Sequence, residues 1–212
     1  MEKKINYQKT LQNTLKNLEK DNIKPKLLLH VCCGPCSTIP LKQLVNYFDI
    51  TLFFNNSNIY PKAEYDRRLD ELQRYLKNNN YKYINLVIAP YEGEKFLECI
   101  EPYKDLKEGY ERCRVCFRKR LSEAAKYASE NAFDYVGTVM TISRYKNAQD
   151  INKIGLSLEK EYPTVKWLCA DFKKNNGYED SLLICKENSL YFQEYCGCKF
   201  SYIAYKNKQE LK

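Results

Sequence analysis

The stretch that decides the fold is LLLHVCCGPCSTIP, which spans Leu27–Pro40. Its first residues form a short apolar run, as expected for a strand that is buried on both faces of a parallel sheet. A turn signal follows at Gly34-Pro35, and Ser37 and Thr38 are good N-cap residues for a helix that packs on the sheet. The stretch therefore predicts a strand, a tight loop and a helix.

Three cysteines occupy this loop, namely Cys32, Cys33 and Cys36. In an open α/β sheet, the loop at the carboxyl end of the first strand is where ligands bind. A dinucleotide or phosphate site needs several glycines at this point, whereas this loop contains only Gly34. The sequence therefore predicts a ligand site that is built on sulfur.

The rest of the chain alternates helical segments with short apolar ones. We expect further strands at 49–55, 84–89, 133–140 and 165–170, and further helices at 7–20, 62–79, 93–100, 113–129, 147–161, 178–187 and from 200 onward. This alternation implies βαβ units with right-handed crossovers. The predicted fold class is α/β, with a doubly wound, mainly parallel sheet of about five strands and with N- and C-terminal helices.

The length of 212 residues fits one domain more easily than two. We expect residues 1–26 to form an N-terminal helical extension and residues 27–212 to form a single α/β catalytic domain. No segment approaches the roughly 18 apolar residues that a membrane span needs, and the charged start lacks the apolar core of a signal peptide. These features predict a cytoplasmic protein without a membrane partner.

The formal net charge of +8 is compatible with a polyanionic partner such as nucleic acid. A solvated basic surface in a Lys- and Asn-rich protein explains the same charge equally well. Composition alone leaves both interpretations open.

Seven of the ten cysteines fall into three clusters, which are Cys32/Cys33/Cys36, Cys113/Cys116 and Cys196/Cys198. Without an export signal, a framework of structural disulfides is not expected. Two clusters lie at predicted helix starts, where the helix dipole favours thiolate over thiol, and the arginines around Cys113 are expected to act in the same direction. Metal binding and redox chemistry both use thiolates. The three remaining cysteines, Cys99, Cys169 and Cys185, are expected to be buried free thiols.

The pairs Cys33/Cys36 and Cys113/Cys116 supply four sulfurs at metal-ligand spacing. Structural zinc is the common use of such a set, but the position on the rim of a sheet and the surplus cysteines favour an iron–sulfur cluster. Zinc stays an alternative. The pair Cys196/Cys198, separated by one glycine, closes only a tight ring. We therefore interpret it first as a redox-active dithiol and second as additional metal ligation.

Several motifs together resemble the cobalamin-independent epoxyqueuosine reductases. They are HVCCGPCS at 30–37, NSNIYPKAEYDRRLDEL at 56–72, ERCRVCF at 111–117, TVMTISRYKN at 138–147, DFKKNNGY at 171–178 and YFQEYCGCKFS at 191–201. The resemblance runs from about Leu27 to Ser201. Each motif would be weak alone, whereas the vicinal cysteines, the second CxxC and the CGC in this order are highly specific.

The resemblance implies a fold similar to the nucleotide α-hydrolase-like (HUP-like) proteins. It also implies an enzyme that reduces epoxyqueuosine to queuosine at the wobble position of tRNA. In the family a 4Fe–4S cluster is assigned to cysteines that correspond to Cys32, Cys33, Cys113 and Cys116, which differs from the choice of Cys33 and Cys36 by spacing. Cys36 is then a nearby thiol that could hold a second iron ion. The redox-active pair of the family corresponds to Cys196 and Cys198.

Removal of an epoxide oxygen requires two electrons and two protons. An iron–sulfur cluster passes one electron at a time, so a second store is useful, either the Cys196/Cys198 dithiol or a second iron that acts as a Lewis acid. For the proton donor we select Asp171 first, with Glu64 and Tyr65 behind it. Asp171 could equally cap the turn that follows it. The electron donor is unidentified.

A base in an anticodon loop can be splayed out without opening a duplex. Basic residues at 112–120 and 173–174 are candidate phosphate contacts, and solvated helix faces are the alternative for each. Two other functions compete with the reductase. A tRNA sulfur-transfer enzyme with a Cys-bound cluster is disfavoured because it needs a glycine-rich pyrophosphate loop. The other is a zinc-stabilised RNA-binding module.

Overall fold

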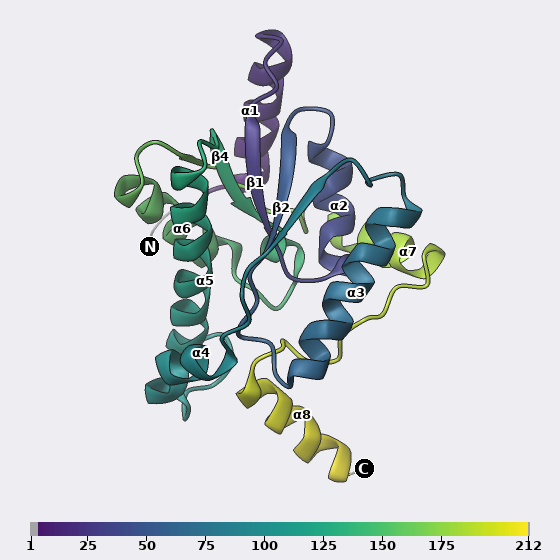
Figure 1. Cartoon of the computed structure of the whole chain (residues 1–212), viewed down its shortest axis with the longest axis vertical. Coiled ribbons are helices and arrows are strands. Elements are labelled where there is room, and N and C mark those ends of the chain that lie inside the picture. The colour runs from purple at the N-terminus through teal and green to yellow at the C-terminus, as the bar shows by residue number, and fades with distance from the viewer. Residues whose placement is uncertain (1–3, 212) are drawn as a thin grey trace.

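A computed structural model describes residues 4–211 and arranges them as a sheet with helices on both faces (Figure 1). The strands are β1 (Lys26–Val31), β2 (Asp49–Phe54), β3 (Asn85–Ile88), β4 (Tyr135–Thr138) and β5 (Lys166–Trp167). All four strand pairs are parallel, in the order β3-β2-β1-β4-β5. The predicted α/β class and the parallel sheet of five strands are confirmed, and the arrangement is consistent with a doubly wound, HUP-like fold.

The helices match the predicted segments closely. They are α1 (Tyr7–Lys20), α2 (Gly34–Leu44), α3 (Lys62–Asn78), α4 (Gly93–Ile100), α5 (Glu111–Glu130), α6 (Ala148–Glu161), α7 (Gly177–Glu187) and α8 (Lys199–Glu210), with 3₁₀ turns η1 (Glu101–Tyr103) and η2 (Val139–Ile142). Helices α2, α3 and α7 cover one face of the sheet, and α4, α5 and α6 lie on the other side (Figure 1).

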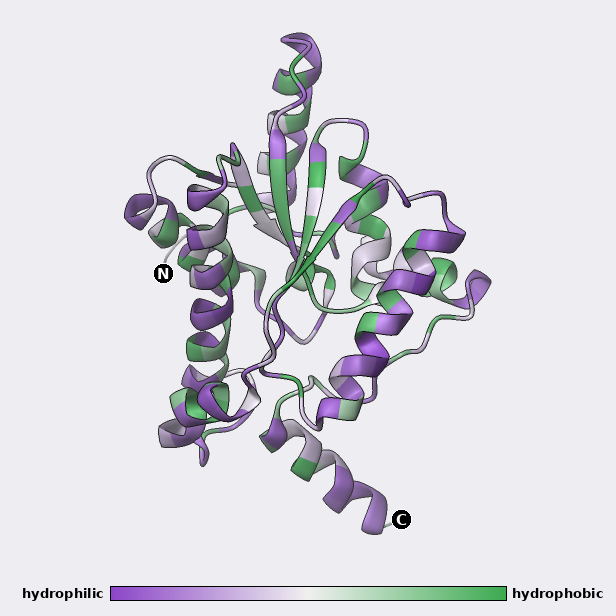
Figure 2. Cartoon of the chain, in the orientation of Figure 1, coloured by the Kyte–Doolittle hydropathy of each residue, from purple (hydrophilic) through white to green (hydrophobic). Residues whose placement is uncertain are grey.

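The central strand β1 explains this layering. Its side chains alternate in direction, so Leu27 and Leu29 enter the core beneath α2 and α3, whereas Leu28 enters the core beneath α5 and α6. All three are fully buried. A strand that is apolar on both faces therefore requires a helical layer on each side. Figure 2 shows the result, with green strands at the centre and purple outer helix faces.

The beginning of α2 differs from the prediction. Ser37 and Thr38 were expected at the N-cap, but the helix begins at Gly34 and its N-cap is Cys33, whose Sγ accepts a hydrogen bond from the backbone N–H of Cys36. Pro35 suits this start because the first helical turn needs no amide hydrogen from it. The expectation for Ser37 and Thr38 was therefore wrong, and a thiol provides the cap.

The strand order places the loop after β1 at a switch point. The chain moves outward from β1 through β2 to β3, then returns to the other side of β1 with β4 and continues to β5. Loops that leave two adjacent strands in opposite directions leave a crevice at their carboxyl ends, and ligands of open α/β sheets bind there. Cys32 follows β1 directly and η2 follows β4 directly.

The N-terminal helix is tied to the body of the protein. Leu11 and Leu18 of α1 belong to the core that also contains Leu27 and Leu29. The division into an extension at 1–26 and a domain at 27–212 stays a prediction. Within residues 4–211, no helix combines the length and the apolar character that crossing a membrane requires.

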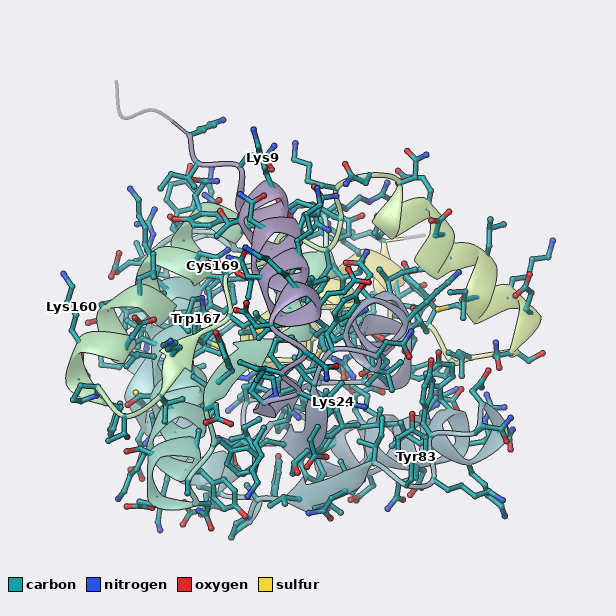
Figure 3. The ribbon with its side chains drawn as sticks, turned by 90° about the horizontal axis from the view of Figure 1, so that it is seen from above. Lys9, Lys24, Tyr83, Lys160, Trp167 and Cys169 are labelled. Carbon is teal, nitrogen blue, oxygen red and sulfur yellow. The ribbon has the colours of Figure 1, made fainter. Side chains whose placement is uncertain are left out.

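Many basic side chains lie on the outer surface. Viewed from above, Lys9 and Lys160 point away from the sheet, and Lys24 is likewise exposed (Figure 3). The net charge of +8 is therefore carried partly by residues spread around the molecule.

We predict that Leu29→Ala lowers the free energy of unfolding by about 3 kcal/mol, since it opens a cavity in the centre of the sheet. Leu183→Ala is the matched control, because Leu183 on α7 is 60% exposed, and it should change the same quantity by less than about 1 kcal/mol. Urea unfolding followed by circular dichroism measures both. Equal losses would contradict the burial pattern of β1.

Candidate active site

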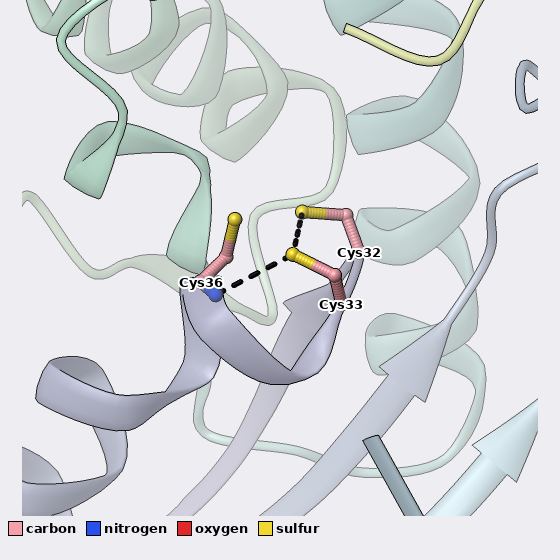
Figure 4. A group of neighbouring side chains, drawn as sticks. All are labelled: Cys32, Cys33 and Cys36. Atoms are coloured by element: carbon pink, nitrogen blue, oxygen red, sulfur yellow. Dashed lines mark hydrogen bonds between the residues drawn. The ribbon is translucent and has the colours of Figure 1, made fainter. Parts of the chain in front are cut away.

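Three thiols gather at the carboxyl end of β1. Cys32, Cys33 and Cys36 are all buried, and their sulfur atoms lie within 4.8 Å of one another (Figure 4). The Sγ atoms of Cys32 and Cys33 are 3.8 Å apart. A metal held tetrahedrally at about 2.3 Å from sulfur also requires neighbouring sulfurs about 3.8 Å apart. This cysteine triad could therefore hold a metal.

A buried polar side chain fixes the strand that leads into the triad. His30, fully buried on β1, contacts Thr138 Oγ1 through Nδ1 (2.9 Å) and the carbonyl of Asn55 through Nε2 (3.2 Å). Burial, with the nearby Arg120, lowers the pKa of His30 to about 3, so the ring is neutral at physiological pH. The single histidine therefore ties β1 to its neighbours.

Hydrogen bonds and burial act in opposite directions on the triad. Hydrogen bonds from Cys33 and Cys36 hold the pKa of Cys32 well below the usual thiol value. Burial raises the pKa of Cys33, and the hydrogen bond with Cys32 raises the pKa of Cys36 to about 12. Of the three sulfurs, Cys32 is therefore the one whose thiolate the surroundings favour most. Bound metal would displace the remaining protons, because metal ligation requires thiolates.

The other two cysteine clusters lie near each other. Both Cys113 and Cys116, in the first turns of α5, interact electrostatically with Cys196 and Cys198. Cys113 and Cys198 also pack against the same core cluster. Within residues 4–211, the triad is the one group of three or more potential ligands whose atoms all lie within 4.8 Å of one another, and Cys113 and Cys116 are outside it. The positions of these cysteines in the sequence do not predict that the second and third clusters lie close together.

Burial acts against the thiolate stabilisation that the helix start and the arginines predict around Cys113. Burial raises the pKa of Cys113, of Cys116 (to about 12) and of Cys196. Desolvation is the largest cause of these increases, since a charge in a low-dielectric interior loses its hydration. Of the nearby arginines, Arg114 is paired with Glu111 and Asp150.

A cavity of about 340 Å³ opens beside the thiols. Its walls include Cys36 of the triad, Cys196 of the third cluster and Lys146, which interacts electrostatically with both sulfurs. Burial lowers the pKa of Lys146, but the thiols of Cys196, Cys32 and Cys36 raise it more, so the net pKa is above the usual lysine value. The remaining walls are rich in aromatic rings, from Tyr145, Tyr178, Phe192, Tyr195 and Tyr205.

The loop that carries Cys196 is held by a buried arginine. Arg68 of α3 is 2% exposed and donates through Nη2 to the carbonyl of Tyr195 and through Nη1 to that of Cys196, both at 3.2 Å. Its Nε bonds to Glu64 at 2.7 Å. The next carbonyl, that of Gly197, accepts from the backbone N–H of Tyr60 at 2.7 Å. Three consecutive carbonyls are therefore fixed from one side.

Gly197 meets two requirements of this turn. Its φ of +124° lies in a region that side chains rarely adopt. A Cβ at this position would also lie 3.0 Å from Nη1 of Arg68. The glycine in the CGC motif thus permits the close approach of the arginine to the backbone between the two cysteines.

The three candidate proton donors, Asp171, Glu64 and Tyr65, do not line this cavity. Asp171 is buried, and Lys173 Nζ bonds to both its carboxylate (2.5 Å) and the carbonyl of Thr141 (3.0 Å). Glu64 pairs with Arg68, and Tyr65 lies with its hydroxyl near the carbonyl of Ala89. The catalytic role of Asp171 stays a prediction.

The basic residues at 112–120 are largely engaged within the protein. Arg118 pairs with Glu161, and Lys119 pairs with Glu123. Arg120 is buried and donates to Asn56 at 2.5 Å. Arg112, also buried, donates to a backbone carbonyl. These contacts favour a structural role over the predicted phosphate contacts at this stretch.

Comparison with known proteins gives a consistent result. The sequence model of the family described as Epoxyqueuosine reductase QueH matches residues 27–204. The chain is 44% identical over 201 residues to a protein of that name from Streptococcus pyogenes serotype M1. The aligned region covers 93% of this chain and 78% of that protein. Identity to the Staphylococcus aureus protein of the same name is 43%, with 93% and 84% covered. Identity to the Thermotoga maritima one is 32%, with 86% and 93% covered.

We predict that Arg68→Met lowers the free energy of unfolding by about 3–5 kcal/mol, because it leaves the buried Glu64 without its cation. Arg114→Met is the control, since Arg114 is about half exposed and its ion pairs are solvated; it should cost less than about 1 kcal/mol. Denaturant unfolding measures both variants. Similar values for the two would contradict the assignment of the Arg68–Glu64 pair as the anchor of the Cys196 loop.

Proposed function

Because the chain belongs to the epoxyqueuosine reductase QueH family, we propose that it is an oxidoreductase that reduces epoxyqueuosine to queuosine in tRNA. The carrying observation is the cavity whose walls include thiols of two clusters and five aromatic rings. A base in an anticodon loop can leave its stack and bind between aromatic side chains. The reacting ring would then lie near sulfur.

The proposed cofactor is a 4Fe–4S cluster. Its proposed ligands are Cys32, Cys33, Cys113 and Cys116, with Cys36 free to hold a second iron ion. The triad supports this proposal because it is a set of soft thiol donors of the type that iron–sulfur centres use. Cys113 and Cys116 need not lie within single-ion distance of the triad, since a cluster of four irons is larger than one ion. When bound, such a cluster supplies electrons one at a time.

The Cys196/Cys198 dithiol is the proposed source of the electron pair. Oxidation of two thiols to a disulfide releases two electrons and two protons. Conversion of the epoxide to an alkene consumes two electrons and two protons and releases water, so the two half-reactions balance. Cys196 lines the cavity, and the Sγ of Cys198 lies 3.5 Å from the hydroxyl of Ser201 at the start of α8. An unidentified electron donor would reduce the disulfide again.

Lys146 and Asp171 have separate proposed roles. Lys146 lines the cavity together with Cys36 and Cys196, and its positive charge would stabilise negative charge that develops on the epoxide oxygen. Asp171 is the proposed proton donor, with Lys173 bonded to its carboxylate. A general acid of this type accelerates proton transfer by about 10²–10⁴-fold.

The proposed partner is the anticodon loop of tRNA, and the proposed location is the cytoplasm. Tyr145 and Phe192 are exposed at the cavity and present rings on which neighbouring bases could stack. Lys208 also lines the cavity and is available for a phosphate. Binding should weaken as salt rises if several phosphates are contacted.

The cofactor proposal predicts that anaerobically purified protein contains about four irons and matching sulfide per chain. Cys33→Ser and Cys113→Ser should each lose most of the iron and the visible absorption. Cys99→Ser is the matched control, because Cys99 lies alone on α4, outside all three clusters, and should retain both. Stoichiometric zinc without iron would instead indicate the zinc-stabilised RNA-binding module.

The proton-donor proposal predicts that Asp171→Asn lowers kcat on epoxyqueuosine tRNA by about 10²-fold or more, with the affinity for that tRNA unchanged. Asp150→Asn is the control, since Asp150 pairs with Arg114 on the surface of α5 and α6, and should retain kcat. Single-turnover kinetics separate the chemical step from binding. Full activity of Asp171→Asn would limit the carboxylate to holding Lys173.

A further inference from the structure

A single serine hydroxyl contacts the CGC turn at three points. Ser201, in the first turn of α8, is 5% exposed and lines the cavity. Its Oγ accepts a hydrogen bond from the backbone N–H of Gly197 at 3.2 Å and donates one to the carbonyl of Cys198 at 2.8 Å. The thiol sulfur of Cys198 lies 3.5 Å from the same oxygen. Ser201 therefore contacts one sulfur of the proposed redox pair as well as the backbone beside it.

The direction of the contact between Ser201 and Cys198 follows from the capacity of a hydroxyl group. A serine side chain offers one hydrogen to donate and two lone pairs that accept. The hydrogen is used on the carbonyl of Cys198, and the N–H of Gly197 uses one lone pair. A lone pair is what remains for the sulfur, so the S–H of Cys198 is the donor. This hydrogen bond exists only while Cys198 carries its proton.

Two of the three hydrogen bonds have an ordinary structural explanation. A serine in the first turn of a helix commonly bonds to the carbonyl three residues earlier, and an acceptor for the N–H of Gly197 completes the turn. Arg68 and the backbone of Tyr60 hold the three carbonyls before Cys198. None of these bonds involves the sulfur, so they support the turn whether Cys198 is a thiol or part of a disulfide. The sulfur contact alone depends on the redox state.

We propose that Ser201 is a positioning residue that sets the redox poise of the Cys196/Cys198 pair by accepting a hydrogen bond from the S–H of Cys198. This inference rests on the proposed function, in which two thiols become a disulfide and release two electrons and two protons. The new S–S bond replaces the S–H bond of Cys198, and the hydroxyl of Ser201 then loses this donor. The dithiol is therefore favoured by one hydrogen bond that the disulfide lacks. The disulfide is easier to reduce again between turnovers, and the dithiol gives up its electrons less readily.

The test measures how readily the pair is oxidised in glutathione buffers of known composition, with glutathione disulfide as the oxidant. Trypsin releases both cysteines on one peptide, residues 187–199, which contains no other cysteine. Anaerobically purified protein is equilibrated, quenched in acid, alkylated and digested. Mass spectrometry of this peptide then gives the fractions of dithiol and disulfide.

Ser201→Ala should shift this equilibrium toward the disulfide. An S–H group is a weak donor, so the expected change is about three-fold, at the lower end of the range for a net hydrogen bond. For a two-electron couple this is a reduction potential lower by about 14 mV. Ser201→Thr retains the hydroxyl and should retain the wild-type equilibrium.

Ser181→Ala is the matched control. Ser181 is also a buried serine in the cavity wall, but its hydroxyl donates to the carbonyl of Tyr178 in its own helix. No sulfur is among its hydrogen-bond partners within the described residues, so the equilibrium should not change. If Ser201 only supports the turn, Ser201→Ala lowers the stability to denaturant and leaves the equilibrium at the wild-type value, and that result would overturn the proposal.

The same measurement separates two failures. If the wild-type peptide carries no disulfide between Cys196 and Cys198 at any glutathione composition, the proposed redox pair itself is wrong. If the disulfide forms and Ser201→Ala titrates like the wild type, only the inference on Ser201 is overturned.

Should Ser201→Ala fail to fold, infrared spectroscopy of the reduced wild-type protein tests the same contact. The S–H stretching band that disappears in Cys198→Ala belongs to Cys198. It should lie below the frequency of a thiol that has no hydrogen-bond acceptor, because a hydrogen bond weakens the S–H bond. A band at the frequency of the unbonded thiol would overturn the inference.

Discussion

Burial of sulfur at the carboxyl end of β1 is the constraint on which the rest of the structure depends. A thiol that must carry negative charge in a dry interior needs hydrogen-bond donors, nearby cations or a metal. The protein supplies donors from the first turn of α2, where Cys33 is the helix cap, and from the amide of Gln193. It supplies a cation as Lys146. His30 is neutral and the leucines of β1 are apolar, so neither adds a charge beside the triad.

Long-range contacts of Arg68 hold the third cysteine cluster, Cys196 and Cys198, at the cavity beside the triad. Arg68 lies on α3, yet it bonds to carbonyls more than 120 residues later in the chain. With Glu64 it forms a buried ion pair, and such pairs contribute more to a specific geometry than to net stability. The Arg68–Glu64 pair fixes the turn at Gly197, and this turn positions Cys196 in the cavity wall.

Much of the fold followed from the sequence, because β1, β2 and the amphipathic helices carry strong periodic signals. The triad was also visible, since Cys32, Cys33 and Cys36 are adjacent in sequence and share one loop. The start of α2 was misplaced because a thiol served as its cap, a use that propensities do not anticipate. The pairing of Cys113 and Cys116 with the CGC turn, the buried state of Arg68 and the engagement of Arg118 and Lys119 in ion pairs depend on tertiary contacts. Local sequence patterns do not predict such contacts.

The anchoring of the Tyr191–Cys198 segment to α3 has a consequence for how the protein matures. Synthesis proceeds from the N-terminus, so the triad exists on the ribosome long before the residues that line the other side of the cavity emerge. Contacts between Arg68 and the carbonyls of Tyr195 and Cys196 form only when almost the whole chain is available. The order of synthesis therefore leaves the thiols of β1 and α2 accessible until the last residues of the cavity wall are in place.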